Sequence, residues 1–246
     1  MGRSVLKLIK EDNEFVIENF LNSDVVIDFS NPISTIQILN ECVKNKKPLI
    51  VGTTGFSKDD LDIIKKASSK IPILLAANMS IGVNNLKESI ETFLDQLTDE
   101  MDCAIDETHH IEKIDKPSGT AIELIDLIKQ IDKNKNIKNI EVNSQRVKDI
   151  FGIHKVTFYN KTKSNYFKHE ALSRDVFAQG ALFSSKIIVG LEPNIYGFKD
   201  ILNWSKSFKK VFFYIEYKNF KHEDSVFIKL GCFFISQLYY ESENNP

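Results

Sequence analysis

The sequence contains little cysteine, with three residues among 246, at Cys42, Cys103 and Cys232. They are odd in number and far apart along the chain, which excludes the dense disulfide framework of small secreted proteins and indicates a reducing compartment. Residues 1–10 contain no apolar core followed by a cleavage site, so no secretory signal peptide is predicted. We therefore expect a soluble, cytoplasmic protein.

Long apolar runs and an excess of basic charge are also lacking. The most apolar stretch near the end, "SVFIKLGCFFISQLYY" (225–240), includes Lys229, and it is shorter than the roughly 20 apolar residues that span a bilayer. The formal net charge is −2, whereas nucleic-acid binding requires a basic patch. The sequence therefore predicts neither a membrane nor a nucleic acid as a partner.

Glycine is scarce, with 10 residues in total, and only Gly2 lies before Gly52. A glycine-rich loop whose backbone N–H groups cradle a pyrophosphate is therefore absent from that stretch. Any dinucleotide site would have to do without such a loop within residues 3–51.

Residues 24–97 alternate between strand-like and helix-like segments. The strand-like segments are short apolar runs such as "DVVIDF" (24–29), as expected for buried parallel strands. The pattern predicts the α/β class with a doubly wound parallel sheet, in which ligands bind beyond the carboxyl ends of the strands. "GTTG" (52–55) and "AANMS" (76–80) follow two of these strands. The predicted strands are 24–29, 48–55 and 71–78, and the predicted helices are 33–45, 57–70, with Ser57 as N-cap, and 81–97.

From Met101 onward, strands follow one another with fewer helices between them. Consecutive strands of this kind predict a second, mixed or antiparallel sheet, and hence a second, smaller domain. The predicted strands are 101–110, 140–147, 152–160 and 165–172, and the predicted helices are 118–131 and 175–191.

The motif "THHIEKIDKPSGTA" (108–121) combines two histidines, a lysine and a helix start. Thr120 and Glu123 have capping-box spacing, which predicts that a helix begins here. The free N–H groups of a helix start, with the hydroxyls of Ser118 and Thr120, favour a carboxylate or phosphate site. Lys113 would add a positive charge, and His109 or His110 would exchange a proton near neutral pH.

Other interpretations of the motif are simpler. A Ser/Thr helix start is most often only a cap, and a histidine pair is more often structural than catalytic. Asp106, Glu107, His109, His110 and Glu112 could suggest a metal cluster, but adjacent histidines on a strand point to opposite faces, so no metal site is predicted. A nucleophilic Ser118 would need a strand–elbow–helix context that is lacking here.

Five blocks of this chain, in order, are similar to characteristic blocks of the dihydrodipicolinate reductase family, also called 4-hydroxy-tetrahydrodipicolinate reductase, of diaminopimelate and lysine synthesis. The resemblance extends over about residues 22–208. It implies a Rossmann-like domain, a smaller mixed-sheet substrate and oligomerisation domain, a homotetramer, and reduction of a small cyclic dicarboxylate by NADH or NADPH. The blocks are "VVIDFSNP", "VGTTGFS", "AANMSIGVN", "HHIEKIDKPSGTA" and "HEALSRDVFAQGA".

The resemblance also implies roles for individual residues. His109 matches the family's proton donor or acceptor, and Lys113 matches a second proton donor. Met79 replaces an aromatic residue that is common at its position, a change that retains apolar packing. The substrate contacts implied are His110, Lys113, Ser118, Gly119 and Thr120, and the residues implied to line the nicotinamide are Gly52, Thr53, Thr54, Ala76, Ala77, Asn78 and Met79.

Both ends of the sequence depart from the family pattern. "MGRSVLKLIK" (1–10) resembles only the end of the family's glycine-rich loop and the helix after it, so the first strand is predicted to be missing. "EFVIENF" (14–20) is either a strand with Glu18 reading the ribose or a continuing helix. Residues 211–246 are rich in Phe and Tyr and resemble nothing in the family; they are predicted to be a hairpin covering a sheet edge, an interaction patch or untrue coding.

These departures give the predicted domains and an alternative function. The alternative is a non-catalytic relative that keeps an oligomeric, dicarboxylate-binding domain but binds the dinucleotide poorly, because the charge-assisted hydrogen bonds of the missing loop are lost. The predicted domains are a truncated dinucleotide domain (1–78), a substrate and oligomerisation domain (79–182), a return segment packing on the dinucleotide domain (183–210) and an unrecognised tail (211–246).

Overall fold

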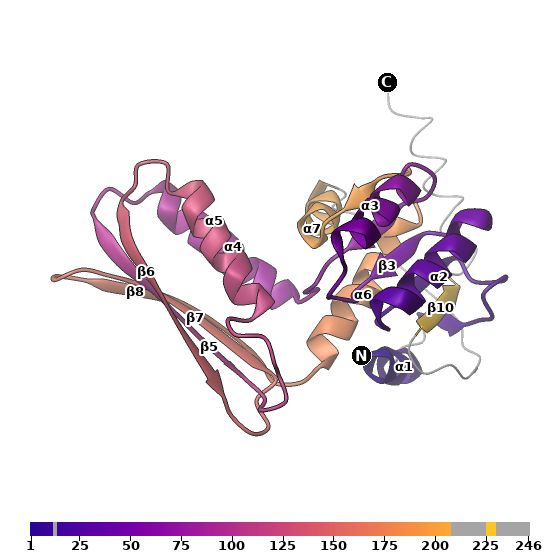
Figure 1. Ribbon diagram of the computed structural model, residues 1–246, viewed down its shortest axis with the longest axis horizontal. Coiled ribbons are helices and arrows are strands. Elements are labelled where there is room, and N and C mark those ends of the chain that lie inside the picture. Colours follow the sequence, from indigo (N-terminus) through magenta and orange to yellow (C-terminus); the bar gives the residue numbers. More distant parts are fainter. Residues whose placement is uncertain (12–13, 208–224, 230–246) are drawn as a thin grey trace. The chain divides into compact units, whose positions relative to one another are not determined.

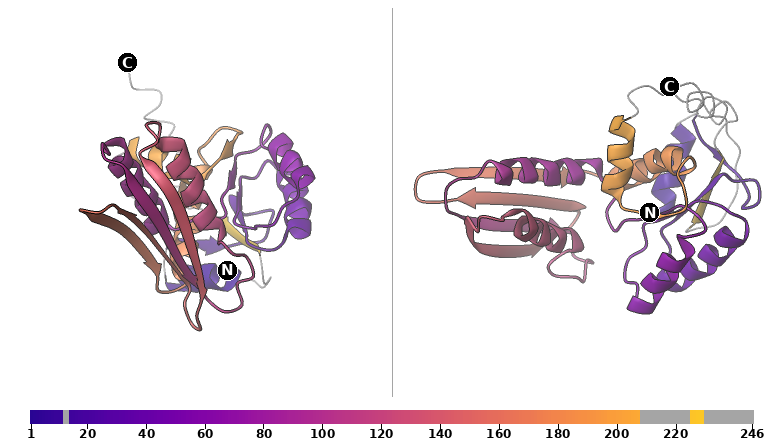
Figure 2. Two further views of the ribbon diagram at one scale, coloured as in Figure 1. Left: turned by 60° about the vertical axis from the view of Figure 1, so that its left-hand side comes forward. Right: turned by 90° about the horizontal axis from the view of Figure 1, so that it is seen from above.

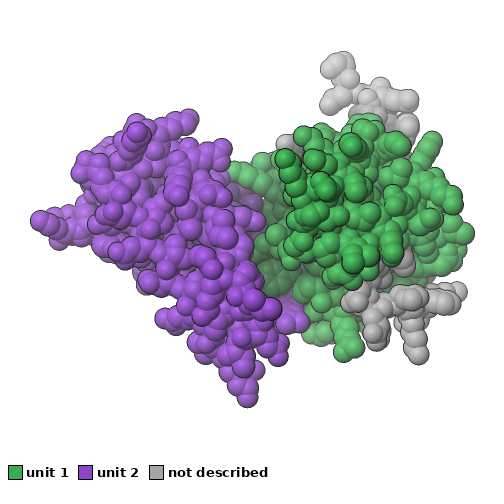
Figure 3. All heavy atoms as spheres, in the orientation of Figure 1, with its two compact units in different colours: residues 1–79, 177–246 green, residues 80–176 purple. Residues whose placement is uncertain are grey.

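The computed structural model describes residues 1–11, 14–207 and 225–229. The chain forms two compact units: unit 1, residues 1–79 with 177–246, and unit 2, residues 80–176 (Figure 3). Of the predicted tail, only residues 225–229 are described, and Cys232 lies outside the described residues. Among the described residues, no helix has the length and apolarity needed to cross a membrane.

Unit 1 is built from a six-stranded sheet and helices that alternate with its strands (Figure 1). Residues 177–188 of α6 belong to this unit. Its elements are α1 (Gly2–Glu11), β1 (Val16–Ile17), β2 (Val25–Asp28), α2 (Pro32–Lys44), β3 (Leu49–Val51), α3 (Lys58–Ala67), β4 (Ile73–Leu75), α6 (Asp175–Ile188), β9 (Ile195–Tyr196), α7 (Phe198–Ser207) and β10 (Ser225–Lys229).

The sheet of unit 1 has the strand order β1-β10-β2-β3-β4-β9. Strands β2, β3, β4 and β9 pair in parallel, which confirms the predicted parallel sheet. Strand β10 is the exception, because it pairs antiparallel with both β1 and β2. The prediction that the tail covers a sheet edge is therefore wrong for residues 225–229, whose backbone groups pair with a strand on each side.

Helices cover both faces of this sheet. Along β2, Val25 and Ile27 pack into one apolar cluster with residues of α1 and α6, whereas Val26 packs into another with residues of α2 and α3. Side chains of a strand alternate between faces, so a continuous run of buried residues needs cover on both sides. The doubly wound arrangement predicted from the sequence is confirmed.

Local signals explain where the elements of unit 1 begin. Asn31 caps α2, with Pro32 at its first position, and Ser57 forms a capping box with Asp60 at the start of α3, as predicted for Ser57. Helix α1 ends at Glu11 and β1 follows at Val16–Ile17. Within residues 14–20 a strand is therefore confirmed for Val16–Ile17, and the alternative of a continuing helix is wrong. The ribose-reading role of Glu18 stays a prediction.

Unit 2 contains a four-stranded mixed sheet with the order β6-β5-β7-β8. The central strand β5 pairs in parallel with β6 and antiparallel with β7, which in turn pairs antiparallel with β8. This confirms the predicted second, mixed sheet. The elements are α4 (Ile81–Asp95), β5 (Met101–His109), α5 (Gly119–Ile131), β6 (Ile137–Arg146), β7 (Gly152–Tyr159) and β8 (Ser164–Ala171).

Helices α4 and α5 lie along one face of the sheet of unit 2 (Figures 1 and 2). Strict alternation along β5 places Met101, Cys103 and Ile105 in the apolar core beneath them, followed on the same face by Glu107 and His109. Two polar side chains thus continue a buried apolar row at the carboxyl end of the strand. The opposite face of the sheet is only partly buried along β5 and β7.

Candidate functional site

The predicted motif lies at the carboxyl end of β5, in the loop that leads to α5. The side chain of Ser118 caps α5, because its Oγ accepts a hydrogen bond of 3.2 Å from the N–H of Ala121. The prediction that Thr120 caps this helix through a Thr120–Glu123 capping box is therefore wrong: the helix begins at Gly119, and Thr120 already lies in its first turn. Which of the two hydroxyl residues, Ser118 or Thr120, caps the helix depends on where the chain turns.

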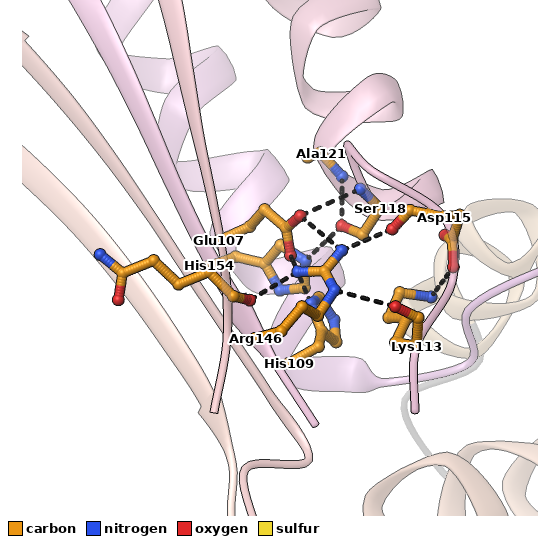
Figure 4. Close-up of polar contacts among 9 residues, drawn as sticks. Glu107, His109, Lys113, Asp115, Ser118, Ala121, Arg146 and His154 are labelled. Carbon is orange, nitrogen blue, oxygen red and sulfur yellow. Dashed lines mark hydrogen bonds and ion pairs between the residues drawn. The ribbon is translucent and has the colours of Figure 1, made fainter. Parts of the chain in front are cut away.

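The carboxylate of Glu107 is the centre of a buried polar cluster (Figure 4). It accepts two hydrogen bonds of 3.0 Å from the guanidinium of Arg146, one to each oxygen. It also bonds to Nδ1 of His109 and accepts a hydrogen bond of 3.3 Å from the N–H of Ser118. Glu107 is completely buried, and a buried charge of this kind is stable only when it is paired and hydrogen-bonded.

Arg146, the last residue of β6, also holds the loop before α5. Its Nε donates to the carbonyl of Lys113 at 3.1 Å, and its Nη2 donates to the carbonyl of Asp115. Parallel pairing places Arg146 beside His109 in the neighbouring strand. One guanidinium therefore connects the strand β6, the carboxylate of Glu107 and the loop that carries Lys113.

The charges of this cluster set the protonation of His109. Burial by itself would raise the pKa of Glu107, but hydrogen bonds from Arg146, Ser144 and His109 outweigh it and lower the pKa to about 2. Burial of the ring, with the positive charges of Lys113 and Arg146, lowers the pKa of His109 despite the opposing carboxylate of Glu107. At neutral pH Glu107 is ionised and His109 is neutral, so Nδ1 donates its proton to Glu107 and Nε2 carries the lone pair.

Lys113 and the start of α5 share the carboxylate of Asp115. The Nζ of Lys113 lies 2.8 Å from Oδ1 of Asp115, and the N–H of Gly119 also donates to this carboxylate. Burial would raise the pKa of Asp115, but the hydrogen bonds and the charge of Lys113 outweigh it and lower the pKa. An anion therefore already lies between the ammonium group and the helix start, which is where an anion site was predicted.

His154, in β7, lies behind Ser118. Its Nε2 is 3.2 Å from Oγ of Ser118, and its ring packs edge-on against that of His109 with centroids 5.0 Å apart. Burial, the charges of the neighbouring histidines and Lys113 lower the pKa of His154 to about 3, against the effect of Glu107. His154 is therefore neutral, and it fixes the hydroxyl of Ser118 rather than carrying charge.

The other predicted substrate residues lie on the same loop and helix start. His110 is partly buried, and its Nδ1 has no hydrogen-bond partner among the described residues. Gly119 is exposed and Thr120 is partly buried, whereas Ser118 is buried. The structure thus brings His109, His110, Lys113, Ser118, Gly119 and Thr120 together within unit 2.

The predicted cofactor residues lie in unit 1, just beyond the carboxyl ends of β3 and β4. Gly52, Thr53 and Thr54 follow β3, and residues 76–79 follow β4. Thr53 is buried and its Oγ1 donates to Asp28 at 3.2 Å. Met79 is buried in the core of unit 1, where its backbone approaches α6 so closely that a Cβ at Gly180 would lie 1.7 Å from its carbonyl oxygen.

The small side chains at these strand ends are suited to binding a dinucleotide. Thr54 and Ala77 are exposed, and Gly52 and Ala76 are partly exposed, so the edge presents small side chains and accessible backbone. Gly55 follows with a φ of +85°, a conformation that glycine adopts without strain. A flat ring can approach backbone closely where side chains are this small.

The sequence prediction assigned no role in the site to Arg146, His154 and Asp115, and it named Glu107 only in a metal cluster that it rejected. The alternation of β5 was the available signal for Glu107, because residues two apart on a strand share a face. Arg146 and His154 reach the site through strand pairing, with His109 beside Arg146 and Glu107 beside His154. That register is not evident from the local sequence.

Comparison with known proteins identifies the family. Residues 1–79 match the family model of dihydrodipicolinate reductase, N-terminus, and residues 82–202 match that of its C-terminus. A protein of Alkaliphilus oremlandii named 4-hydroxy-tetrahydrodipicolinate reductase is 40% identical over 193 residues, covering 73% of this chain and 80% of the relative. A protein of the same name from Thermosipho africanus is 38% identical over 201 residues, covering 82% and 87%.

A solved structure supports the fold assignment. It is described as a dipicolinate-bound dihydrodipicolinate reductase from Paenisporosarcina sp. TG-14, and it superposes with a TM-score of 0.58 at 22% identity, covering 71% of each chain. Together with the sequence matches, this confirms the predicted fold class and the predicted family of reductases. The chain belongs to the dihydrodipicolinate reductase family.

Proposed function

We propose that this chain reduces 4-hydroxy-tetrahydrodipicolinate to tetrahydrodipicolinate with NADH or NADPH, in diaminopimelate and lysine synthesis. The observation that carries the proposal is the site in unit 2, where a neutral imidazole, an ammonium group and a helix start lie within one short stretch, residues 109–119. Family membership supplies the substrate. No finding favours the alternative of a non-catalytic relative, and the N-terminal family model matches residues 1–79.

The start of α5 and Lys113 are proposed to bind the carboxylates of the substrate. Lys113 and the N–H of Gly119 now hold the carboxylate of Asp115, so both groups are oriented toward an anion. A substrate carboxylate would take the place of Asp115 on these donors, with Thr120 and His110 beside it. Ser118 contributes by holding the helix start, because its N–H and hydroxyl already bond to Glu107 and to Ala121 and His154.

His109 and Lys113 are proposed to exchange protons with the reacting part of the substrate. Loss of the 4-hydroxyl group as water leaves a conjugated cyclic imine. Hydride addition to it leaves electron density on the ring nitrogen or an adjacent carbon, and a proton delivered there avoids an unstable anion. Lys113 supplies an ammonium proton. His109 presents Nε2, the nitrogen that Glu107 leaves free, as the atom that takes up or returns a proton.

The dinucleotide, when bound, supplies the hydride. The residues proposed to hold its nicotinamide end are in unit 1, at the ends of β3 and β4. Small side chains and accessible backbone support this assignment. The buried bond between Thr53 and Asp28 supports it further, because it fixes the turn that follows β3. The residues are Gly52, Thr53, Thr54, Ala76, Ala77, Asn78 and Met79.

We also propose a homotetramer in the cytoplasm. Within unit 2, whose residues are all described, the two helices lie on the same face of the sheet (Figure 2). The other face carries Tyr166, 66% exposed, beside partly buried residues of β7, which suits burial against other copies. The free thiols of Cys42 and Cys103 support a reducing compartment.

Ligand titration tests the proposed function. The full chain is titrated with NADH and NADPH by nicotinamide fluorescence, with and without 2,6-pyridinedicarboxylate, and turnover is then assayed with the hydroxylated substrate. We expect saturable binding of at least one dinucleotide in the micromolar range and measurable turnover. A folded chain that binds the dicarboxylate but neither dinucleotide would establish the non-catalytic alternative instead.

Thr120→Val provides the matched variant for the dicarboxylate site. Valine keeps the shape of threonine but removes the hydroxyl, so loss of one hydrogen bond to a charged group should weaken 2,6-pyridinedicarboxylate binding by roughly tenfold. Dinucleotide affinity in the absence of the dicarboxylate should stay unchanged. Unchanged dicarboxylate affinity would remove Thr120 from the proposed substrate contacts.

A further inference from the structure

We propose that Glu107 and Arg146 are positioning residues: together they hold the imidazole of His109 in one tautomer and fix the loop that carries Lys113. The inference rests on the proposed function and deepens it, because it assigns the proton chemistry of the site to four residues rather than two. Neither Glu107 nor Arg146 needs to touch the substrate. Each acts through a residue that does.

Glu107 and Arg146 form a buried ion pair in which both charges are compensated. The side chain of Glu107 is 0% exposed and that of Arg146 is 8% exposed. The two groups meet in a bidentate arrangement with both distances at 3.0 Å, a geometry that fixes the plane of the guanidinium relative to the carboxylate. Because both charges are compensated inside unit 2, the carboxylate of Glu107 is a buried, ionised acceptor held in a fixed orientation.

Glu107 also fixes the orientation of His109. Nδ1 bonds to Glu107, so the carboxylate selects the tautomer that carries its proton on Nδ1. On the other side of the ring lies Gly152, where an added Cβ would be 3.2 Å from Nε2 of His109. The ring is thus held between a carboxylate and Gly152, where a side chain would make a tight contact with it. Its Nε2 becomes the atom available for proton exchange.

The same pair holds the loop between β5 and α5. The guanidinium of Arg146 donates to the carbonyls of Lys113 and Asp115, while Glu107 accepts from the N–H of Ser118 at the loop's end. The ion pair therefore fixes the backbone of the proton donor Lys113 and the start of α5 at the same time (Figure 4). Losing the guanidinium of Arg146 would release the loop even if every substrate contact were intact, whereas glutamine at position 107 keeps an oxygen that can accept from the N–H of Ser118.

A buried ion pair can instead serve stability alone. Under that reading, substitution lowers the free energy of unfolding and leaves the ionisation of His109 and the binding of a dicarboxylate unchanged in the folded protein. A positioning role predicts a different result, because the effect of substituting Glu107 on activity must then depend on the presence of His109. A double-mutant cycle separates the two.

The test compares Glu107→Gln, His109→Gln and the double variant in the full chain. We expect Glu107→Gln to lower kcat by roughly 10²-fold with little change in KM. In the His109→Gln background it should cause little further loss. Additive losses would overturn the proposal, since they would mean that Glu107 does not act through His109. Glu123→Gln, which breaks the Lys87–Glu123 ion pair of α4 and α5, is the control and should leave kcat unchanged.

The pH profile gives a second readout. The ionisable or charged groups facing His109 are Glu107 on its own strand, Arg146 of β6, His154 of β7 and Lys113 of the loop. Of these, Glu107 favours the protonated ring. The limb of the kcat/KM profile that reports His109 should therefore move to lower pH in Glu107→Gln, and an unmoved limb would contradict the assignment.

Arg146→Lys tests the loop. Lysine keeps the charge but lacks the planar fork, so it cannot hold Glu107 and two carbonyls together. We expect 2,6-pyridinedicarboxylate to bind roughly tenfold more weakly, and unchanged affinity in a folded variant would overturn this part of the proposal.

One measurement needs neither a variant nor turnover. Imidazole nitrogen NMR of the unsubstituted protein should show His109 protonated on Nδ1 at neutral pH, and protonation on Nε2 would overturn the proposal. If the protein lacks reductase activity but shows this tautomer, the proposed function fails while the positioning role of Glu107 stands.

Discussion

Two buried carboxylates, one in each unit, lie near the ends of strands but have different partners. Asp28, at the end of β2, accepts hydrogen bonds from the hydroxyls of Thr35 and Thr53 and from the N–H of Ser30. Glu107, in β5, bonds to a guanidinium and an imidazole. The hydroxyl and amide donors of Asp28 come from three segments, so its carboxylate connects these segments to one another. The partners of Glu107 are a guanidinium and an imidazole, and the imidazole connects it to proton exchange. Burial alone does not identify a functional carboxylate; its partners do.

The largest loss of activity should come from removing the imidazole of His109, to which Glu107 is hydrogen-bonded. His109→Gln keeps a polar side chain but cannot exchange a proton, so hydride transfer should fall by roughly 10²–10⁴-fold. Single-turnover reduction, followed by loss of nicotinamide absorbance, measures the step. Near-normal turnover would end the assignment of His109.

His169→Gln is the matched control for this variant. His169 is a partly buried histidine of unit 2, in β8, and its Nε2 lies 3.4 Å from Oγ of Ser80. Its partner in strand pairing is His154, whereas none of the hydrogen bonds described above for Glu107 and Arg146 involves it. Turnover by this variant should stay within about twofold of the unsubstituted protein, and a loss as large as that of His109→Gln would show that the assay responds to packing in unit 2 rather than to the site.

The comparison predicts a different outcome for Asp28. Asp28→Ala leaves the hydroxyls of Thr35 and Thr53 buried without this acceptor, which should lower the free energy of unfolding by about 2–3 kcal/mol. It should also weaken dinucleotide binding, because the turn after β3 loses its tie. Urea unfolding and nicotinamide fluorescence measure the two effects. Dicarboxylate binding in unit 2 should not change, and an equal loss there would remove the distinction between the two carboxylates.

Much of the fold could be predicted from the sequence because its signals are local. Short apolar runs followed by capped helices gave the parallel sheet of unit 1, and alternation in residues 101–109 gave β5. Strand β10 could not be placed, because pairing between residues 225–229 and β2 joins segments far apart in the chain. Nothing in the tail itself indicates which strand it meets, so its position between β1 and β2 required the structure.

The candidate site divides in the same way. His109, Lys113 and the helix start are close in sequence, so one motif contains them. Arg146 and His154 reach Glu107 only through the register of β5 with β6 and β7. Both Ser118 and Thr120 have hydroxyls, and the spacing from Thr120 to Glu123 favours the wrong one as the cap. Local chemistry was therefore predictable, and the network that orients it was not.

Acid should destabilise the protein through its buried histidines. The pKa of His154 is lowered to about 3 and those of His109 and His169 are also lowered, in each case first by burial. Below about pH 6.5 the unfolded chain binds protons that the folded chain does not, so stability falls as the pH falls. The pKa of Glu107 is lowered from its ordinary value of 4.5 to about 2, so this carboxylate adds a further loss of stability only below about pH 4.5. Between pH 6 and 5, unfolding in urea should become easier by about 1 kcal/mol or more.

His154→Gln sharpens this expectation. Glutamine does not titrate, so the slope of the free energy of unfolding against pH between 6 and 4 should decrease. The decrease should be at most the contribution of one bound proton, about 1.4 kcal/mol per pH unit. The same slope in the variant and the unsubstituted protein would mean that His154 is accessible to protons in the folded state, and that its neutral role behind Ser118 is wrong.

The smallest expected effect concerns a third carboxylate, that of Asp115, which is exposed and holds the donors proposed for the substrate. In Asp115→Asn the side chain keeps its size but loses its charge, so Lys113 and the N–H of Gly119 lose the anion that now occupies them. We expect 2,6-pyridinedicarboxylate to bind about threefold more tightly at low salt, with the gain shrinking as salt screens Lys113. Calorimetric titration at two ionic strengths measures both. Weaker binding would mean instead that Asp115 orients Lys113 for the substrate, which would place all three carboxylates among residues that hold other groups in position.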